Sequence, residues 1–138
     1  MTQKEIDLLL KDLCARLPYN VKIKIKTYED IDEIDSIGTL RQLNKQYFWI
    51  LEDEYERCIE YNKPYLFPLS SMTEEQKQEY TYIVNYISSD DTENWKEGEF
   101  IYVEQFTQLM HFYHINHLDY MGLIPMGLAN DATGLNIY

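Results

Sequence analysis

The densest group of side chains able to bind a metal or move protons lies near the end of the chain. It consists of three histidines at every third position and one aspartate: His111, His114, His117 and Asp119. Imidazole nitrogens and carboxylate oxygens are ligands that zinc, iron and manganese accept in proteins. On one straight helix, His111 and His117 would lie about 120° apart with His114 between them, so the three rings converge poorly. A metal-dependent enzyme is one hypothesis; the expectation we prefer is a surface position for His111 and a helix-terminal cation at His117.

Sequence motifs of other enzyme classes are missing. The chain contains no Gly-x-Ser-x-Gly nucleophile turn, no phosphate-binding loop, no Cys-x-x-Cys pair and no dinucleotide-binding glycine fingerprint. Ser70 and Ser71 precede a predicted helix start, where helix capping explains their hydroxyls. We therefore expect no cofactor and favour a protein that is not an enzyme.

Four large side chains are candidates for contacting a partner. Trp95 is the one large apolar residue of the polar stretch 90–99, where an anchored loop tip or a binding hot spot would use it. Tyr120, Met121 and Met126 lie in the apolar, glycine- and proline-containing segment after the histidines.

Charge is unevenly distributed along the chain. The 138 residues carry a net charge of −12. Residues 1–46 contain eight bases and eight acids, whereas residues 47–138 contain four bases and sixteen acids. Such a field repels phosphates and argues against nucleic acid as a partner.

Length, apolar content and cysteine spacing indicate the number of domains and the cellular compartment. The length predicts a single domain over residues 1–138, with enough apolar side chains for one core. We find no secretory signal and no apolar run long enough to span a membrane. Cys14 and Cys58 are isolated, which is typical of thiols in a reducing compartment. We expect a cytoplasmic location without membrane association.

The first part of the chain predicts a helix followed by antiparallel strands. Thr2 and Glu5 form a capping box before a helix over residues 3–16, which Pro18 ends. Its apolar face is Ile6, Leu9, Leu10, Leu13 and Leu17, and its polar face is Lys4, Asp7, Lys11, Asp12 and Arg16. Alternation over residues 21–26 places Val21, Ile23 and Ile25 in the core and Lys22, Lys24 and Lys26 on a face open to water or a partner.

The middle of the chain predicts further strands and a crossover. Residues 29–35 form an acidic, solvated turn, and residues 37–43 and 47–51 form a hairpin around 44–46. Residues 51–61 are ambiguous between helix and strand, and we favour a third or fourth strand. Two prolines make residues 63–71 an extended crossover.

The last part of the chain predicts two longer helices. The first begins at a capping box on Thr73 and ends near Ser88; its inner face is Tyr80, Ile83, Val84 and Ile87. The second follows a polar loop over residues 90–99, begins at Phe100 or Val103, and ends near Asn116. Its predicted core face is Val103, Phe106, Met110 and Tyr113, widened by Leu109 and Phe112. Residues 122–127 form a turn that folds the tail back onto the domain.

Together these patterns predict an α+β fold. It has an N-terminal helix, an antiparallel sheet of three or four strands, and two longer C-terminal helices packed on one face of the sheet.

Three segments of the chain resemble a known group of sequences. They are residues 13–22 (LCARLPYNVK), 63–75 (KPYLFPLSSMTEE) and 117–129 (HLDYMGLIPMGLA). They are similar to a family of small uncharacterised proteins encoded by gut anaerobes and by their phages and mobile elements, in which Arg often stands where this chain has Met121. The resemblance implies a cytoplasmic accessory role linked to phages, and no activity or cofactor.

Three hypotheses on function remain at this point. The first is a protein-interaction module that is not an enzyme. The second is an acidic mimic of nucleic acid that inhibits a host DNA-binding protein, and the third is the metal-dependent enzyme of the histidine cluster.

Overall fold

The computed structural model describes residues 1–29, 32–88 and 95–138. Its first element is helix α1 (Gln3–Arg16), with the bounds expected from the sequence. The Glu5 amide donates to Thr2 Oγ1 at 3.3 Å, and the Thr2 amide donates to Glu5 Oε2 at 2.6 Å. This reciprocal capping box satisfies two amide groups that the first helical turn leaves without partners.

Four strands form one antiparallel sheet in the order β1-β2-β3-β4. They are β1 (Lys22–Glu29), β2 (Asp32–Leu43), β3 (Tyr47–Ile50) and β4 (Arg57–Cys58). Asn44 closes the predicted hairpin, because its Oδ1 accepts from the amides of Gln46 and Tyr47, both at 2.9 Å. The ambiguous segment contains the short β4 and then a 3₁₀ turn, Ile59–Tyr61.

The acidic segment 29–35 is not the solvated turn that we predicted. Glu29 belongs to β1, Asp32 and the residues after it belong to β2, and residues 30–31 lie outside the described part of the chain. Strand pairing overrides the unfavourable composition, since Lys26 lies opposite Asp35 and the Lys24 ammonium pairs with the Asp35 carboxylate at 2.6 Å.

The predicted alternation of β1 is confirmed. Val21, just before the strand, and Ile23 and Ile25 within it are fully buried. The lysines alternate with them, and two have partners on the opposite strand: Lys24 pairs with Asp35, and Lys22 Nζ donates to Thr39 Oγ1 at 2.7 Å.

The C-terminal segment returns to the sheet, as expected from its turn. Strand β5 (Tyr65–Leu66) in the crossover pairs in parallel with β6 (Asn130–Asp131). This strand pair was not predicted. Gly122 and Gly127 both have φ of +73°, a left-handed conformation that glycine adopts without strain. These two turns bring Leu123, Leu128 and Ala129 into the core beneath the sheet.

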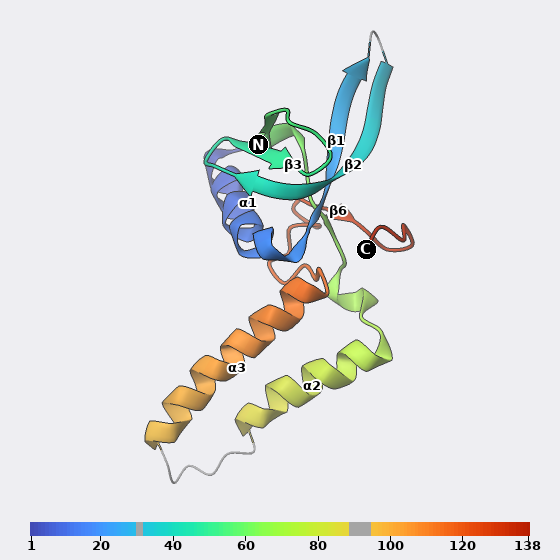
Figure 1. Ribbon diagram of the computed structural model, residues 1–138. Helices are drawn as coiled ribbons and strands as arrows, with labels where there is room; N and C mark the ends of the chain where they lie inside the picture. Colours follow the sequence, from blue (N-terminus) through green and yellow to red (C-terminus); the bar gives the residue numbers. More distant parts are fainter. Residues whose placement is uncertain (30–31, 89–94) are drawn as a thin grey trace.

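Helices α2 (Glu74–Ser88) and α3 (Trp95–Ile115) pack against each other. Figure 1 shows them as a hairpin that extends away from the sheet. We call this pair the arm, and we call α1, the sheet and residues 117–138 the body. The predicted polar loop is wrong at its end, because α3 already begins at Trp95; residues 89–94 lie outside the described chain.

Packing of the two long helices on a sheet face is not confirmed. The core beneath the sheet is built by α1, the strands and the C-terminal segment, and its buried members include no arm residue. A smaller core lies where the arm meets the body: Ile83 and Phe112 of the arm and Leu118 of the body are buried in it, with Phe67, Met72, Tyr80, Leu109 and Tyr113 packed against them. Within the described residues, no helix is both long and apolar enough to cross a membrane.

Candidate functional site

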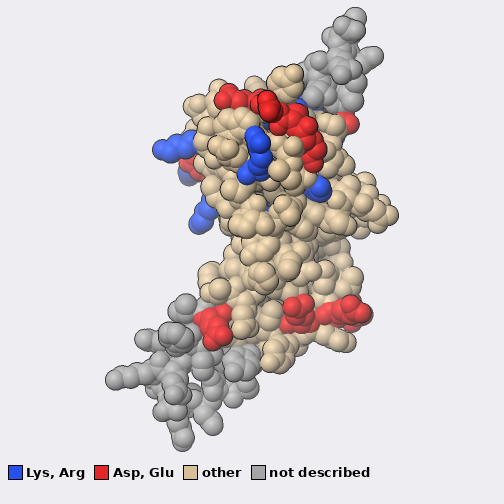
Figure 2. Space-filling view, in the orientation of Figure 1, with Lys and Arg blue, Asp and Glu red and all other residues tan. Residues whose placement is uncertain are grey.

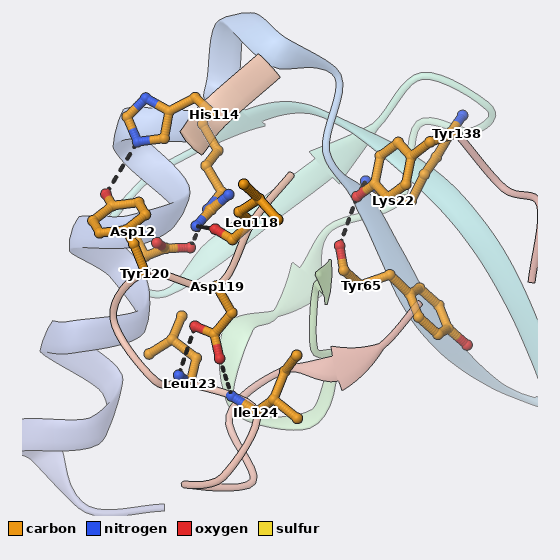
Figure 3. Close-up of polar contacts among 11 residues, drawn as sticks. Asp12, Lys22, Tyr65, His114, Leu118, Asp119, Tyr120, Leu123, Ile124 and Tyr138 are labelled. Carbon is orange, nitrogen blue, oxygen red and sulfur yellow. Dashed lines mark hydrogen bonds and ion pairs between the residues drawn. The ribbon is translucent and has the colours of Figure 1, made fainter. Parts of the chain in front are cut away.

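Arg16 is the centre of a polar cluster where the body meets the arm. Its side chain is fully buried, and its Nε donates to Asp12 Oδ2 at 2.6 Å. Its Nη2 donates to the carbonyl of Leu118 at 2.7 Å, and the guanidinium carbon lies 5.2 Å from the centre of the Tyr120 ring. Arg16 therefore ties α1 to the segment that follows α3, as Figure 3 shows around Asp12, Leu118 and Tyr120.

The helix pattern had placed Asp12 and Arg16 on the polar face of α1, and this prediction is wrong. Both side chains have no exposed surface. Burial raises the pKa of Asp12 more than the Arg16 guanidinium lowers it. The signal that could have revealed the pair is its i,i+4 spacing beside the buried Leu9 and Leu13.

Two histidines of α3 extend the same cluster. Tyr120 Oη and His114 Nε2 lie 3.0 Å apart, and Tyr19 Oη and His111 Nδ1 are also 3.0 Å apart. Burial, followed by the neighbouring Arg16 charge, lowers the pKa of His114 to about 4. His114 is therefore neutral at pH 7. We name this set the junction cluster: Asp12, Arg16, Tyr19, His111, His114 and Tyr120.

His117 is not the helix-terminal cation that we expected. It has φ of +53°, just after the end of α3, and its ring stacks on Tyr138 with 3.6 Å between ring centres. Burial, then the charge of Arg16, lowers its pKa to about 4. Tyr138 Oη in turn accepts from the Lys22 amide at 2.9 Å and donates to the Tyr65 carbonyl at 2.7 Å (Figure 3).

Asp119 shapes the C-terminal turn. Its two carboxylate oxygens accept from the amides of Leu123 and Ile124, each at 2.8 Å (Figure 3). Its own amide donates to the Phe67 carbonyl at 2.8 Å, and the Phe67 amide donates to the His117 carbonyl at 2.9 Å. Asp119 therefore holds backbone in place with both carboxylate oxygens and its own amide.

The structure does not bring the four predicted metal ligands together. His111 contacts Tyr19, His114 contacts Tyr120, His117 stacks on Tyr138, and Asp119 binds backbone amides. Across residues 1–29, 32–88 and 95–138, no group of three His, Cys, Asp or Glu side chains could hold a metal ion.

The predicted partner contacts have different positions. Tyr120 is half-buried, with its ring stacked on Tyr113 at 5.0 Å, and Met121 packs against the main core. Met126 is 47% exposed and remains accessible. The side chain of Trp95, the first residue of α3, lies outside the described residues.

The surface of α3 differs most from the prediction. Phe106, expected in the core, is 65% exposed, whereas Gln105, Phe112 and His114 are buried; of these three, Phe112 was expected there. Gln105 Nε2 donates to the Ile83 carbonyl at 2.6 Å, and its buried Oε1 has no hydrogen-bond partner among the described residues. The buried face of α3 is thus shifted relative to the predicted one, although Leu109, Phe112 and Tyr113 do pack in the small core. The rings of Tyr80, Phe112 and Tyr113 lie together, with 6.0 to 6.3 Å between ring centres.

Comparison of the chain with protein-family models, with curated proteins and with solved structures found no match.

Proposed function

We propose that this protein is a protein-interaction module, not an enzyme, and that the arm carries the binding surface. The observation that supports this most is the 65% exposure of Phe106 on an extended helical hairpin. Residues 106, 110 and 113 have the i, i+4, i+7 spacing of a core-facing stripe. Of these three side chains, Phe106 is exposed, Met110 is half-buried and Tyr113 packs against the small core. An exposed large aromatic side chain is a candidate anchor for a protein partner.

The composition of this part of α3 also fits an interface. Residues 105–118 contain no Asp, Glu, Lys or Arg. Ile115 is 55% exposed and Met110 is half-buried, so uncharged side chains reach the surface along the helix. The centres of protein interfaces are depleted of charged residues and enriched in aromatic residues and Met.

The two other hypotheses have weaker support. A mimic of nucleic acid needs carboxylates in a continuous row, but the face in Figure 2 carries them in two groups with an uncharged band between. A metal-dependent enzyme needs ligands that converge, whereas His111 and His114 lie beside Tyr19, His117 stacks on Tyr138, and Asp119 binds backbone amides.

Location is part of the same proposal. Cys14 and Cys58 are both free thiols, which is typical of a reducing compartment such as the cytoplasm. The accessory role linked to phages or mobile elements has the sequence resemblance as its support.

Affinity capture from a lysate of the encoding organism tests the proposal. The baits are the natural chain, Phe106→Ser in the arm, and Tyr55→Ser as a matched control, because Tyr55 is 73% exposed in the body. We expect proteins that the natural chain and Tyr55→Ser retain and that Phe106→Ser loses. Equal retention by all three baits would remove the arm from the proposal.

A further inference from the structure

The clearest anchor of the tail, residues 133–138, is the side chain of Tyr138. Residues 133–136 are exposed, and the Leu135 amide donates at 3.1 Å to the carbonyl of the nearby Ala132. Tyr138 instead reaches residues far away in the sequence, because its ring stacks on His117 and its hydroxyl bonds to β1 and β5. A terminal segment whose side chains are mostly exposed belongs to the part of a protein that opens locally at low cost.

The Tyr138 hydroxyl lies where a hydrogen bond between β1 and β5 is expected. Ile23, on β1, and Pro64, just before β5, form an antiparallel bridge, so the next pair in this register is Lys22 with Tyr65. Because Pro64 has no N–H, the pairs on either side of the bridge carry the hydrogen bonds, and the Lys22 amide would donate directly to the Tyr65 carbonyl. The Lys22 amide donates instead to Tyr138 Oη at 2.9 Å, and Tyr138 Oη donates to the Tyr65 carbonyl at 2.7 Å (Figure 3). The phenol hydroxyl is thus inserted between the two strands.

A direct bond does form on the other side of the bridge. There the Lys24 amide donates to the Lys63 carbonyl at 2.8 Å. At the pair of Lys22 and Tyr65, the gap needs a group that accepts one hydrogen bond and donates another. A phenol hydroxyl does both.

Two aromatic side chains form walls for the ring. The Tyr138 ring lies on His117 with 3.6 Å between ring centres and 16° between planes, and it lies against Phe67 with 5.8 Å between centres. The walls are linked to each other without the tail, because the Phe67 amide donates to the His117 carbonyl at 2.9 Å. Burial raises the pKa of the Tyr138 hydroxyl above its ordinary value, so this group is a protonated donor at neutral pH. We call the gap and its walls the tyrosine slot: Lys22, Tyr65, Phe67 and His117.

We propose that the tyrosine slot is a binding site for the phenol side chain of a tyrosine, and that the chain fills it with its own Tyr138 as a releasable ligand. The N–H donor, the carbonyl acceptor and the two aromatic walls match both the hydroxyl and the ring of a phenol. A water molecule would bridge the same backbone groups but leave the His117 ring without its stacking partner. A phenylalanine ring would fill the slot but lacks the bridging hydroxyl. Release of the tail opens the slot to another tyrosine.

Filling an emptied slot with a small phenol tests the site. Tyr138→Gly removes the phenol from the full chain and leaves both backbone groups in place. The probes are p-cresol, which is the tyrosine side chain without its backbone, and toluene, which lacks only the hydroxyl. We expect p-cresol to raise the thermal midpoint of Tyr138→Gly by at least about 2 °C and to shift the NMR signal of the Lys22 amide. Toluene should bind at least about fivefold more weakly, because it makes neither hydrogen bond.

A matched control removes a tyrosine that fills no slot. Tyr55 is 73% exposed in the body, so Tyr55→Gly leaves no space for a ring. The same concentration of p-cresol should leave the thermal midpoint of Tyr55→Gly unchanged. The natural chain should respond less than Tyr138→Gly, because its slot is already filled.

Hydrogen exchange in the natural chain tests the release of the tail, whether or not Tyr138→Gly folds. The Lys22 amide should exchange at least about tenfold faster than the Lys24 amide, because release frees the first and leaves the second bonded to Lys63. Tyr138→Phe keeps the ring and removes the acceptor of the Lys22 amide. It should speed exchange at Lys22 further, by at least about threefold, and leave Lys24 unchanged.

Five results would overturn the inference. They are equal binding of p-cresol and toluene, equal effects of p-cresol on Tyr138→Gly and Tyr55→Gly, equal exchange rates at Lys22 and Lys24, and unchanged exchange at Lys22 in Tyr138→Phe. The fifth is a concentration-dependent dimer of the natural chain in sedimentation that Tyr138→Gly abolishes, because the tyrosine in the slot would then come from a second copy.

Discussion

The buried pair Asp12–Arg16 provides the sharpest test of how α1 is held to the segment that follows α3. Replacing Arg16 by Met keeps an apolar stem and removes the guanidinium. The change breaks the 2.6 Å ion pair, removes the donor to Leu118 and removes the cation beside Tyr120. Asp12 would then be a fully buried carboxylate without a partner.

The expected cost follows from these contacts. Breaking a buried ion pair by removing one partner costs about 3–5 kcal/mol, mainly because the remaining charge stays buried. Loss of the Arg16 donor adds little, since the Leu118 carbonyl also accepts from the Tyr120 amide at 3.1 Å. Asp12→Leu/Arg16→Met removes both charges, and Leu matches the shape of Asp, so the double variant should lose about 2 kcal/mol less than Arg16→Met alone.

Urea unfolding at neutral pH, followed by tryptophan fluorescence and by circular dichroism, measures these free energies. Arg41→Met is the matched control, because Arg41 is exposed on β2 and its loss should change stability by less than about 0.5 kcal/mol. The reasoning fails if Arg16→Met costs less than about 1 kcal/mol. It also fails if the double variant costs as much as the sum of the two single variants.

Three further substitutions test other parts of the structure. Because the pKa of His117 and that of His114 are both lowered to about 4, the unfolded chain binds more protons below pH 6.5, and stability should fall by about 2 kcal/mol per histidine between about pH 7.5 and pH 5. His117→Asn removes one of the two histidines, and Asn tolerates the left-handed backbone at this position. The variant should roughly halve the combined loss of stability, measured by urea unfolding at the two pH values. An unchanged loss would contradict the lowered pKa of His117. Gly38→Ala would place a Cβ 2.5 Å from Ile50 Cδ1, so it should cost about 1–3 kcal/mol in the same assay, and Ile50→Val should restore part of that cost. Gln105→Met removes a buried oxygen without a partner and should raise the thermal midpoint by stabilising the arm by about 1 kcal/mol, whereas a lower midpoint would show that the amide is needed.

Helices and strands were predicted correctly where the residues that determine them lie close together in the sequence. The capping box and Pro18 gave α1 its correct bounds, and the second capping box placed the start of α2. Strict alternation identified the buried face of β1. Each of these features depends on residues close together in sequence.

Contacts between distant segments explain the errors. Acidic composition suggested a turn over residues 29–35, yet pairing with β1 stabilises strand there. The charge of Arg16 suggested an exposed side chain, but a carbonyl 102 positions away completes its burial. Helical periodicity shows which side chains share a face, but not which of two adjoining faces packs against another helix. Phe106 was therefore assigned to the core, although the neighbouring Gln105 is the buried residue. The histidines are close in sequence, but His111 pairs with Tyr19 of the N-terminal part, His114 with the nearby Tyr120, and His117 with the C-terminal Tyr138.

A photo-crosslinking amino acid at position 106 tests the central claim most directly. p-Benzoylphenylalanine replaces Phe106 in one protein and Tyr55 in another, and both are irradiated in a lysate of the encoding organism. If the arm is the binding surface, a discrete crosslinked protein forms from position 106 and not from position 55. Crosslinking from position 55 alone, or the same products from both positions, would contradict the proposal that the arm binds the partner.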